Sequence, residues 1–308
     1  MNRAQFVGAD ILSMRDFDKN QILTLLEVCK EFERVQGPIL QGKILGSFFF
    51  EPSTRTRLSF ECAMNRLGGR TIGFAEAQST SSSKGESLWD TIKVAESYCD
   101  IMVLRHPQEG AARLAAEASA IPVINGGDGA NQHPTQTLLD LYTILRRAGR
   151  IDRLKVAMVG DLKYGRTVHS LIRSLALFQC SFWLVSPPPL SMPEDFLEDL
   201  ADQGAECEEV TDLGDVDSDL DILYVTRIQR ERFPDPLEYE RVRNAYELTA
   251  NSVERFESRL TIMHPLPRNT ELDRSLDQHP GAAYFDQVKN GVLVRKAILA
   301  LLLGAVSE

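Results

Sequence analysis

The sequence predicts an α/β protein of two domains, each a mostly parallel sheet flanked by helices. Short apolar runs bounded by turn residues alternate with amphipathic helical segments along nearly the whole chain, which is the pattern of βαβ units. The chain also has 308 residues, about twice the usual length of one domain. These two observations together favour two sheets over one.

Seven segments are predicted as strands because they are short, apolar and bounded by polar or turn residues. They cover residues 44–50, 100–104, 121–125, 155–160, 181–186, 221–226 and 260–263. Two helices, 56–67 and 167–178, follow strands and carry apolar residues at helical spacing. A further helix covers about 134–147, and the last helix begins after Asn290-Gly291.

The best domain boundary follows the helix that ends at Gly149, because the polar segment 150–153 separates it from the next strand. We expect residues 1–134 plus 290–308 to form one domain and residues 150–285 to form the other. Helices at about 134–149 and 290–308 link them. The last helix is apolar on all sides, so it is expected to be buried.

Composition excludes several classes of protein. Lys and Arg number 34 against 44 Asp and Glu, and a net charge of −10 argues against nucleic acid or a membrane as partner. The five cysteines are scattered singly, so neither a zinc site nor a disulfide framework is expected. No apolar run approaches the ~18 residues of a membrane span, and no export signal is visible, so we expect a cytoplasmic protein.

Polar clusters follow most of the predicted strands, where ligands bind to open α/β sheets. Most of these clusters contain arginine, which favours a multiply anionic ligand held in a cleft between the two domains. The clusters cover residues 53–56, 105–107, 125–136, 163–166, 227–229 and 264–268.

The cluster at 53–57 is the strongest, because hydroxyls and arginines stand at a predicted helix start, where the helix dipole favours phosphate. A capping Ser53 with solvated arginines is the alternative, which we rank second because capping needs fewer such groups. His133 also precedes a helix, and a neutral imidazole there can donate to a carbonyl oxygen. A capping or surface histidine is the alternative. Residues 160–166 lack the G-x-G-x-x-G spacing of a dinucleotide site.

At these clusters the sequence resembles the catalytic chains of the aspartate and ornithine carbamoyltransferases, and the aspartate enzymes most of all. The matching stretches cover residues 50–57, 84–86, 105–110, 127–129, 132–136, 160–167 and 264–268. The resemblance implies transfer of the carbamoyl group from carbamoyl phosphate to L-aspartate, the committed step of pyrimidine (UMP) biosynthesis. It implies no cofactor and no metal. The first domain would bind carbamoyl phosphate and the second aspartate.

The resemblance also implies roles for individual residues. The phosphate would be held by Ser53, Thr54, Arg55, Thr56 and Arg105. Lys84 and a loop serine, Ser81 or Ser82, would come from the neighbouring subunit of a homotrimer. Thr56, Arg105 and His133 would contact the carbonyl oxygen, and Gln136 with the backbone of Pro265 and Leu266 would contact the carbamoyl NH₂. The aspartate carboxylates would be bound by Lys84, Arg166, Arg227 and Gln229. Arg55, Thr56, Lys84, Arg105 and His133 would form the catalytic group.

The residues leave two alternative functions open. Ornithine as acceptor is disfavoured because ornithine enzymes generally carry cysteine at the position of Pro265, and because Arg166, Arg227 and Gln229 suit a dicarboxylate. A silent homologue that senses a phosphorylated metabolite would not need His133. Residues 105–112 and 160–171 resemble the forms that associate with separate zinc-containing regulatory chains, so such a partner is also considered.

Overall fold

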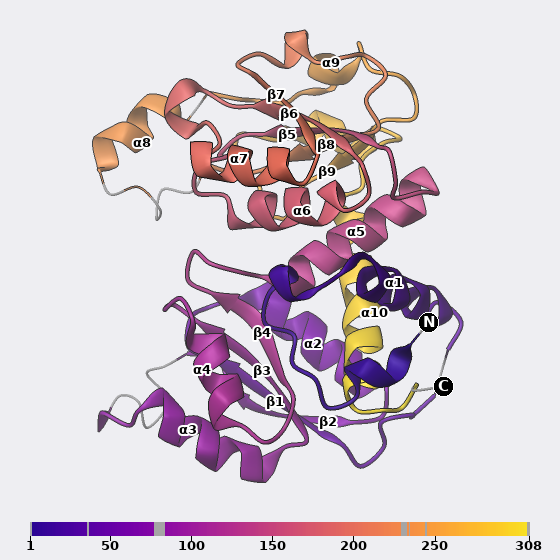
Figure 1. Ribbon diagram of the computed structural model, residues 1–308, viewed down its shortest axis with the longest axis vertical. Coiled ribbons are helices and arrows are strands. Elements are labelled where there is room, and N and C mark those ends of the chain that lie inside the picture. The colour runs from indigo at the N-terminus through magenta and orange to yellow at the C-terminus, as the bar shows by residue number, and fades with distance from the viewer. Residues whose placement is uncertain are drawn as a thin grey trace. The chain divides into compact units, whose positions relative to one another are not determined.

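The computed structural model describes residues 2–35, 37–76, 84–228, 233, 235–243 and 245–306. The chain divides into two compact units, Met1–Tyr142 with Val288–Glu308, and Thr143–Gln287. Each unit contains one parallel sheet (Figure 1), so the predicted fold class is confirmed. Within the described ranges, no helix is long and apolar enough to cross a membrane.

The first unit is built on a sheet with the strand order β2-β1-β3-β4. Its strands are β1 (Ile44–Phe49), β2 (Arg70–Phe74), β3 (Ile101–His106) and β4 (Val123–Asp128). Its own helices are α1 (Lys19–Glu31), α2 (Thr54–Arg66), α3 (Leu88–Ala95) and α4 (Ala111–Ala118). In Figure 1, α3 and α4 lie on one side of the sheet and α2 on the other. Ile92 of α3 and Ala115 of α4 pack with Phe48 and Leu104 of the strands, which buries that face.

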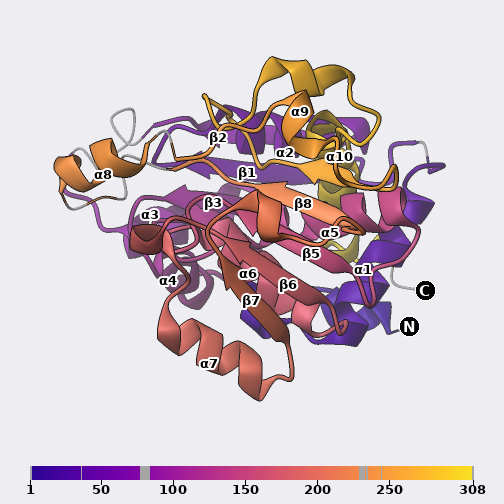
Figure 2. The ribbon, with the colours of Figure 1, turned by 90° about the horizontal axis from the view of Figure 1, so that it is seen from above.

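The second unit is built on a sheet with the strand order β7-β6-β5-β8-β9, and β7, β6, β5 and β8 lie next to one another in Figure 2. The strands are β5 (Lys155–Val159), β6 (Ser181–Val185), β7 (Glu206–Val210), β8 (Ile222–Val225) and β9 (Thr261–Met263). The helices are α6 (Arg166–Ala176), α7 (Glu194–Asp202), α8 (Pro236–Val242) and α9 (Ala250–Val253). Two further helices, α5 (Pro134–Ala148) and α10 (Tyr284–Leu302), contain the points at which the chain passes from one unit to the other.

Each sheet has a point at which the strand order reverses. In the first sheet it lies between β1 and β3, and in the second between β5 and β8. Ligands of open α/β sheets bind at the carboxyl ends of the strands on either side of such a point. Residues just after β1 and at the end of β3, and residues just after β5 and β8, are therefore the ones the fold places for binding.

All seven predicted strands are confirmed, and β2 and β7 are two strands that the sequence analysis missed. Both are edge strands with mostly exposed residues, so they lack the continuous apolar run that identifies a buried parallel strand.

The start of the last helix was predicted wrongly, because α10 begins at Tyr284 and continues through Asn290-Gly291. A Cβ atom at Gly291 would lie 3.2 Å from Leu139 of α5 and 2.6 Å from Arg295 Nη1. Gly291 therefore serves close packing between α10 and α5, and the pair that resembles a turn signal lies inside a buried helix.

Candidate active site

The start of α2 carries a serine hydroxyl that does not cap the helix. Ser53 is the N-cap residue, with extended backbone (φ −156°, ψ 95°), and its carbonyl accepts from Arg57 N at 3.3 Å. The Ser53 side chain makes no capping hydrogen bond. The interpretation of Ser53 as an ordinary capping serine is therefore wrong. Thr54 and Arg55 follow it in the exposed first turn, where backbone N–H groups and the helix dipole favour an anion.

Arg105 lies within β3, close to its carboxyl end, with its side chain fixed by two partners. Its Nη2 lies 2.6 Å from Glu51 Oε1, and its Nη1 donates to the Gly126 carbonyl at 3.2 Å. The end of β1 is joined to β3 at the same place, because Phe50 N donates to the Arg105 carbonyl at 2.8 Å. The guanidinium is thus held at the reversal point of the first sheet.

Two of the predicted site residues meet directly. Thr56 Oγ1, in the first turn of α2, lies 3.3 Å from His133 Nε2, and both side chains are buried. His133 stands immediately before α5, and its carbonyl accepts from Gln136 N at 3.0 Å. The hydroxyl and the imidazole therefore come together from the N-terminal ends of two helices. Both groups can contact the same small ligand.

Asp128 fixes the turn that delivers His133, and the sequence analysis gave it no role. Its Oδ1 accepts from Asn125 Nδ2 at 2.8 Å and from Gln132 N at 3.0 Å, while its Oδ2 accepts from Gly110 N at 2.9 Å. The side chain is 2% exposed. A carboxylate inside the glycine-rich segment 126–129 was the available signal.

In the second unit, the loop after β5 is a tight turn. Gly160 has φ +121°, and a Cβ atom there would lie 2.3 Å from the Thr226 carbonyl oxygen, so glycine is required. Asp161 Oδ1 accepts from Tyr164 N at 2.9 Å, which closes the loop before Arg166 begins α6. Arg227 follows β8 by two residues. Both arginines therefore stand at the reversal point of the second sheet.

The backbone at Pro265 and Leu266 is held by His264. Leu266 N donates to His264 Nδ1 at 2.8 Å, and His264 Nε2 lies 2.9 Å from Glu271 Oε1. His264 is 1% exposed, and burial lowers its pKa, although the Glu271 carboxylate opposes that shift. The imidazole is therefore neutral at pH 7, accepting at Nδ1 and donating at Nε2. Glu271 is a second supporting residue that the sequence analysis missed.

Arg268 has a structural partner, although the sequence analysis counted its cluster among the anion-binding ones. Its Nη2 donates to Asp277 Oδ2 at 2.8 Å, and its guanidinium lies 5.4 Å from the Tyr284 ring centroid. The Arg268 hydrogen bond lowers the pKa of Asp277 to about 2. This arginine ties the segment after β9 to the start of α10.

Comparison with known families decides the classification. The model of the aspartate/ornithine carbamoyltransferase carbamoyl-P binding domain matches residues 9–146, and that of the Asp/Orn binding domain matches residues 152–302. The chain belongs to the aspartate/ornithine carbamoyltransferase family.

Relatives in this family match nearly the whole chain. The aspartate carbamoyltransferase catalytic subunit of Methanopyrus kandleri is 55% identical, over 98% of this chain and 99% of its own. A solved catalytic subunit of aspartate transcarbamoylase from M. jannaschii superposes with a TM-score of 0.90 at 53% identity, covering 96% of this chain and 98% of that one. The enzyme from Trypanosoma cruzi, solved with carbamoyl phosphate and aspartate, has a TM-score of 0.91 at 37% identity, with 98% and 99% covered.

Not all residues predicted for a carbamoyltransferase site meet in the structure. In the first unit, Ser53, Thr54, Arg55, Thr56, Arg105 and His133 share the carboxyl edge of the sheet, and Gln136 follows in the first turn of α5. Lys84 is exposed and forms no hydrogen bond or ion pair with the described residues. Ser81, Ser82 and Gln229 lie outside the described residues.

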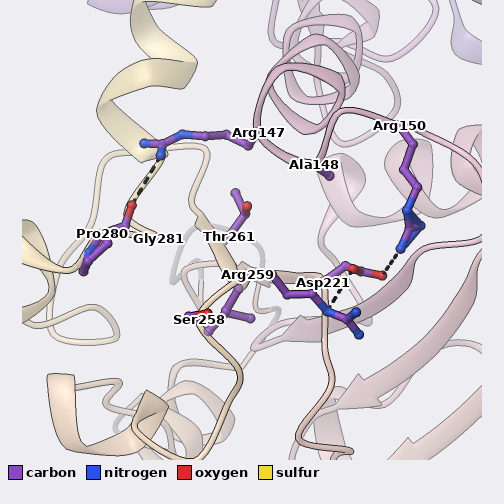
Figure 3. A pocket seen from close by; sticks show the side chains of 10 residues that line it. Arg147, Ala148, Arg150, Asp221, Ser258, Arg259, Thr261, Pro280 and Gly281 are labelled. Atoms are coloured by element: carbon purple, nitrogen blue, oxygen red, sulfur yellow. Dashed lines mark hydrogen bonds and ion pairs between the residues drawn. The ribbon is translucent and has the colours of Figure 1, made fainter.

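A pocket of about 360 Å³ in the second unit lies at the opposite edge of the sheet from the carbamoyltransferase residues, at the amino ends of β8 and β9 (Figure 3). It is rich in arginine, but Arg150 lies 2.9 Å from Asp221 Oδ2, and Arg259 lies 3.4 Å from Asp221 Oδ1. Arg147 donates to the carbonyls of Pro280 and Ala282. The pocket also lies away from the carboxyl ends of the strands, where ligands of open α/β sheets bind, so it is a poor candidate for the substrate site.

In the described part of the chain, no group of three or more His, Cys, Asp or Glu side chains could hold a metal ion. The donors that the first unit gathers are hydroxyl, guanidinium and imidazole groups, which suit phosphate and carbonyl oxygens.

Proposed function

We propose that the chain transfers the carbamoyl group of carbamoyl phosphate to the amine of L-aspartate, giving N-carbamoyl-L-aspartate and phosphate in pyrimidine biosynthesis. The observation that carries the proposal is the Thr56–His133 pair at the start of α2, where the Ser53 side chain makes no capping hydrogen bond. The relatives of the chain support aspartate as acceptor, since those at about 55% identity over the full length are aspartate carbamoyltransferases.

The chemistry needs little acid–base machinery. The uncharged amine attacks the carbonyl carbon, a C–N bond forms, and negative charge grows on the carbonyl oxygen. The C–O bond to phosphate then breaks, and the departing phosphate takes both the electron pair and the amine proton. Fixed donors accelerate such a step when they are aimed at the charge that develops. We assign His133, Thr56 and Arg105 to the carbonyl oxygen, and Ser53, Thr54, Arg55, Thr56 and Arg105 to the phosphate.

The acceptor residues belong to the second unit. We assign the two carboxylates of aspartate to Arg166 and Arg227 at the ends of β5 and β8, together with Gln229 and Lys84. The backbone of Pro265 and Leu266, held by His264, is assigned with Gln136 to the carbamoyl NH₂. These assignments require residues 1–134 with 290–308 to act as the carbamoyl phosphate domain and residues 150–285 to act as the aspartate domain.

The assembly we propose is a homotrimer in which Lys84 and Ser81 or Ser82 complete the site of a neighbouring subunit. The exposed Lys84, with no hydrogen bond or ion pair to the described residues, supports this role. Zinc-containing regulatory chains are a further proposed partner. We also propose a cytoplasmic location, which the scattered single cysteines favour.

Product analysis tests the proposed function. The purified chain is supplied with carbamoyl phosphate and, separately, L-aspartate, L-ornithine, N-acetylornithine or putrescine, and the products are identified by mass spectrometry. Carbamoyl-aspartate alone is expected. Transfer only to another amine would overturn the roles of Arg166, Arg227 and Gln229, while transfer to none would favour the silent sensor.

A further inference from the structure

Gln136, which we assign to the carbamoyl NH₂, is held in one orientation by Asp140. Gln136 Nε2 donates to Asp140 Oδ1 at 2.9 Å, one turn further along α5. Asp140 is 0% exposed, whereas Gln136 is only half-buried. An ionised carboxylate can only accept hydrogen bonds, so the NH₂ end of the amide must face Asp140. The other end, the carbonyl oxygen Oε1, is thereby turned away from Asp140.

The negative charge of Asp140 is supported by Arg295 of α10. Arg295 is 3% exposed, and its Nη1 donates to the Gly291 carbonyl at 3.1 Å. Its guanidinium lies 5.0 Å from the ring centroid of Phe60 on α2. Burial lowers the pKa of Arg295 to about 10, and the Asp140 carboxylate opposes that shift, so the arginine keeps its charge at neutral pH. A buried cation thus interacts with the carboxylate that orients Gln136.

Two opposite charges buried in one interior are a poor source of stability, because desolvation offsets most of their attraction. Their presence in the interior of the first unit calls for a reason beyond packing. Two of the helices involved carry residues of the proposed site: α2 begins with Thr54, Arg55 and Thr56, and α5 carries Gln136. Asp140 and Arg295 therefore influence the site indirectly, through the orientation of Gln136.

We propose that Asp140, supported by Arg295, is a positioning residue that turns Gln136 Oε1 toward the donor substrate, where it accepts from the carbamoyl NH₂. The proposal rests on the proposed function, because it takes Gln136 as the contact of that NH₂. With the amide reversed, two NH₂ groups would face each other and no hydrogen bond would form. Asp140 therefore determines the preference for a carbamoyl donor over an acyl phosphate of the same shape.

Acetyl phosphate is the probe that isolates this effect. It has the phosphate and carbonyl groups of carbamoyl phosphate, but a methyl group replaces the NH₂. A site built to bond an N–H discriminates against the analogue that lacks it, because the polar group of the site is left unpaired. The measured quantity is the ratio between the KM for carbamoyl phosphate and the inhibition constant of acetyl phosphate competing with it, on the full-length chain.

In Asp140→Asn, the new amide can donate as well as accept, so Gln136 is free to reverse. The KM for carbamoyl phosphate is expected to rise about tenfold, the worth of one hydrogen bond, while the inhibition constant of acetyl phosphate changes less than about twofold. Arg295→Met, which removes the supporting charge, is expected to change the same ratio in the same direction. Thr137→Val is the matched control, since this buried hydroxyl of α5 has no hydrogen-bond partner among the described residues. It should leave both constants unchanged.

If a folded Asp140→Asn or Arg295→Met protein binds both ligands more weakly to the same extent, the two residues have a purely structural role and the proposal is overturned. An unchanged ratio of the two constants in both variants would also overturn it. Gln136→Leu separates this failure from that of the proposed function. It should reproduce the loss of discrimination, and if it does not, the assignment of Gln136 itself is wrong. If Gln136→Leu loses discrimination while Asp140→Asn keeps it, only the positioning role of Asp140 fails.

Discussion

At the scale of single residues, the first unit contains donors that its fold does not need. Ser53 stands at a helix start without capping it, whereas Asp18, at the start of α1, forms a complete capping box with Gln21. The Asp18 side chain thus stabilises its helix, whereas the Ser53 hydroxyl is left for a ligand.

Replacing each of these caps should give opposite results. Asp18→Ala should lower the free energy of unfolding by about 1 kcal/mol and leave the kinetic constants unchanged. Ser53→Ala should change the free energy of unfolding by less than about 0.5 kcal/mol but raise the KM for carbamoyl phosphate. Urea unfolding and initial rates provide the two readouts. A destabilised Ser53→Ala protein with normal KM would return Ser53 to a capping role.

His133→Ala should lower kcat by at least about a hundredfold, because a donor aimed at the developing oxyanion acts in the transition state. The dissociation constant of carbamoyl phosphate should change much less. His279→Ala is a control that removes an imidazole from the other unit. Equal losses in kcat and in binding would exclude the role of His133 in polarising the carbonyl.

Seven strands and the helices α2, α5, α6 and α10 could be predicted from the sequence, because buried parallel strands and amphipathic helices have strong patterns. The helices α1, α3, α4, α7, α8 and α9 were not among the predicted segments. The edge strands β2 and β7 could not be predicted, since few of their side chains are buried. At the site, the ligand-facing clusters were visible as residues after strands. Among their supports, Asp128 left a signal as a carboxylate inside a glycine-rich segment. Asp140 and Glu271 left none, because a single carboxylate gives no signal until the fold brings its partners together. The same is true of Arg268, whose partner Asp277 lies nine residues away.

At the scale of elements, Gly291 tests why α10 passes through a pair that resembles a turn signal. Alanine has the higher helix propensity by about 1 kcal/mol, so an isolated helix would be stabilised by Gly291→Ala. In this protein the added Cβ would meet Leu139 and Arg295, and overpacking should destabilise by about 1–3 kcal/mol. Val288→Ala, at a residue 43% exposed on the same helix, is the control. A stabilised Gly291→Ala protein would contradict the packing argument.

The stability contributed by the Arg268–Asp277 ion pair, in the segment after β9, should depend on pH. Arg268 lowers the pKa of Asp277 to about 2 in the folded protein, below the usual value of 3.8, so this pair contributes stability above pH ~4 that is lost as the pH falls toward 2. Asp277→Asn should therefore be less stable than the native chain at pH 7, and the difference should shrink between pH 4 and pH 2. A difference independent of pH would contradict the ion pair.

At the scale of the whole molecule, the proposed trimer predicts complementation. Lys84→Ala and Arg55→Ala should each be nearly inactive. Mixed by dissociation and reassociation, they should regain activity at about a quarter of the sites, where an intact Arg55 of one subunit meets an intact Lys84 of the next. Mixing each variant with itself is the control. No regain would indicate self-contained sites.

The central claim is that the clusters at the two sheet edges act on one reaction. The most direct measurement is calorimetric titration with N-(phosphonacetyl)-L-aspartic acid, the compound bound in the Trypanosoma cruzi enzyme, because it joins a phosphonate to an aspartate. Arg105→Ala in the first unit and Arg166→Ala in the second should each weaken its binding at least about a hundredfold relative to the native chain. Loss from only one of the two replacements would contradict the shared site.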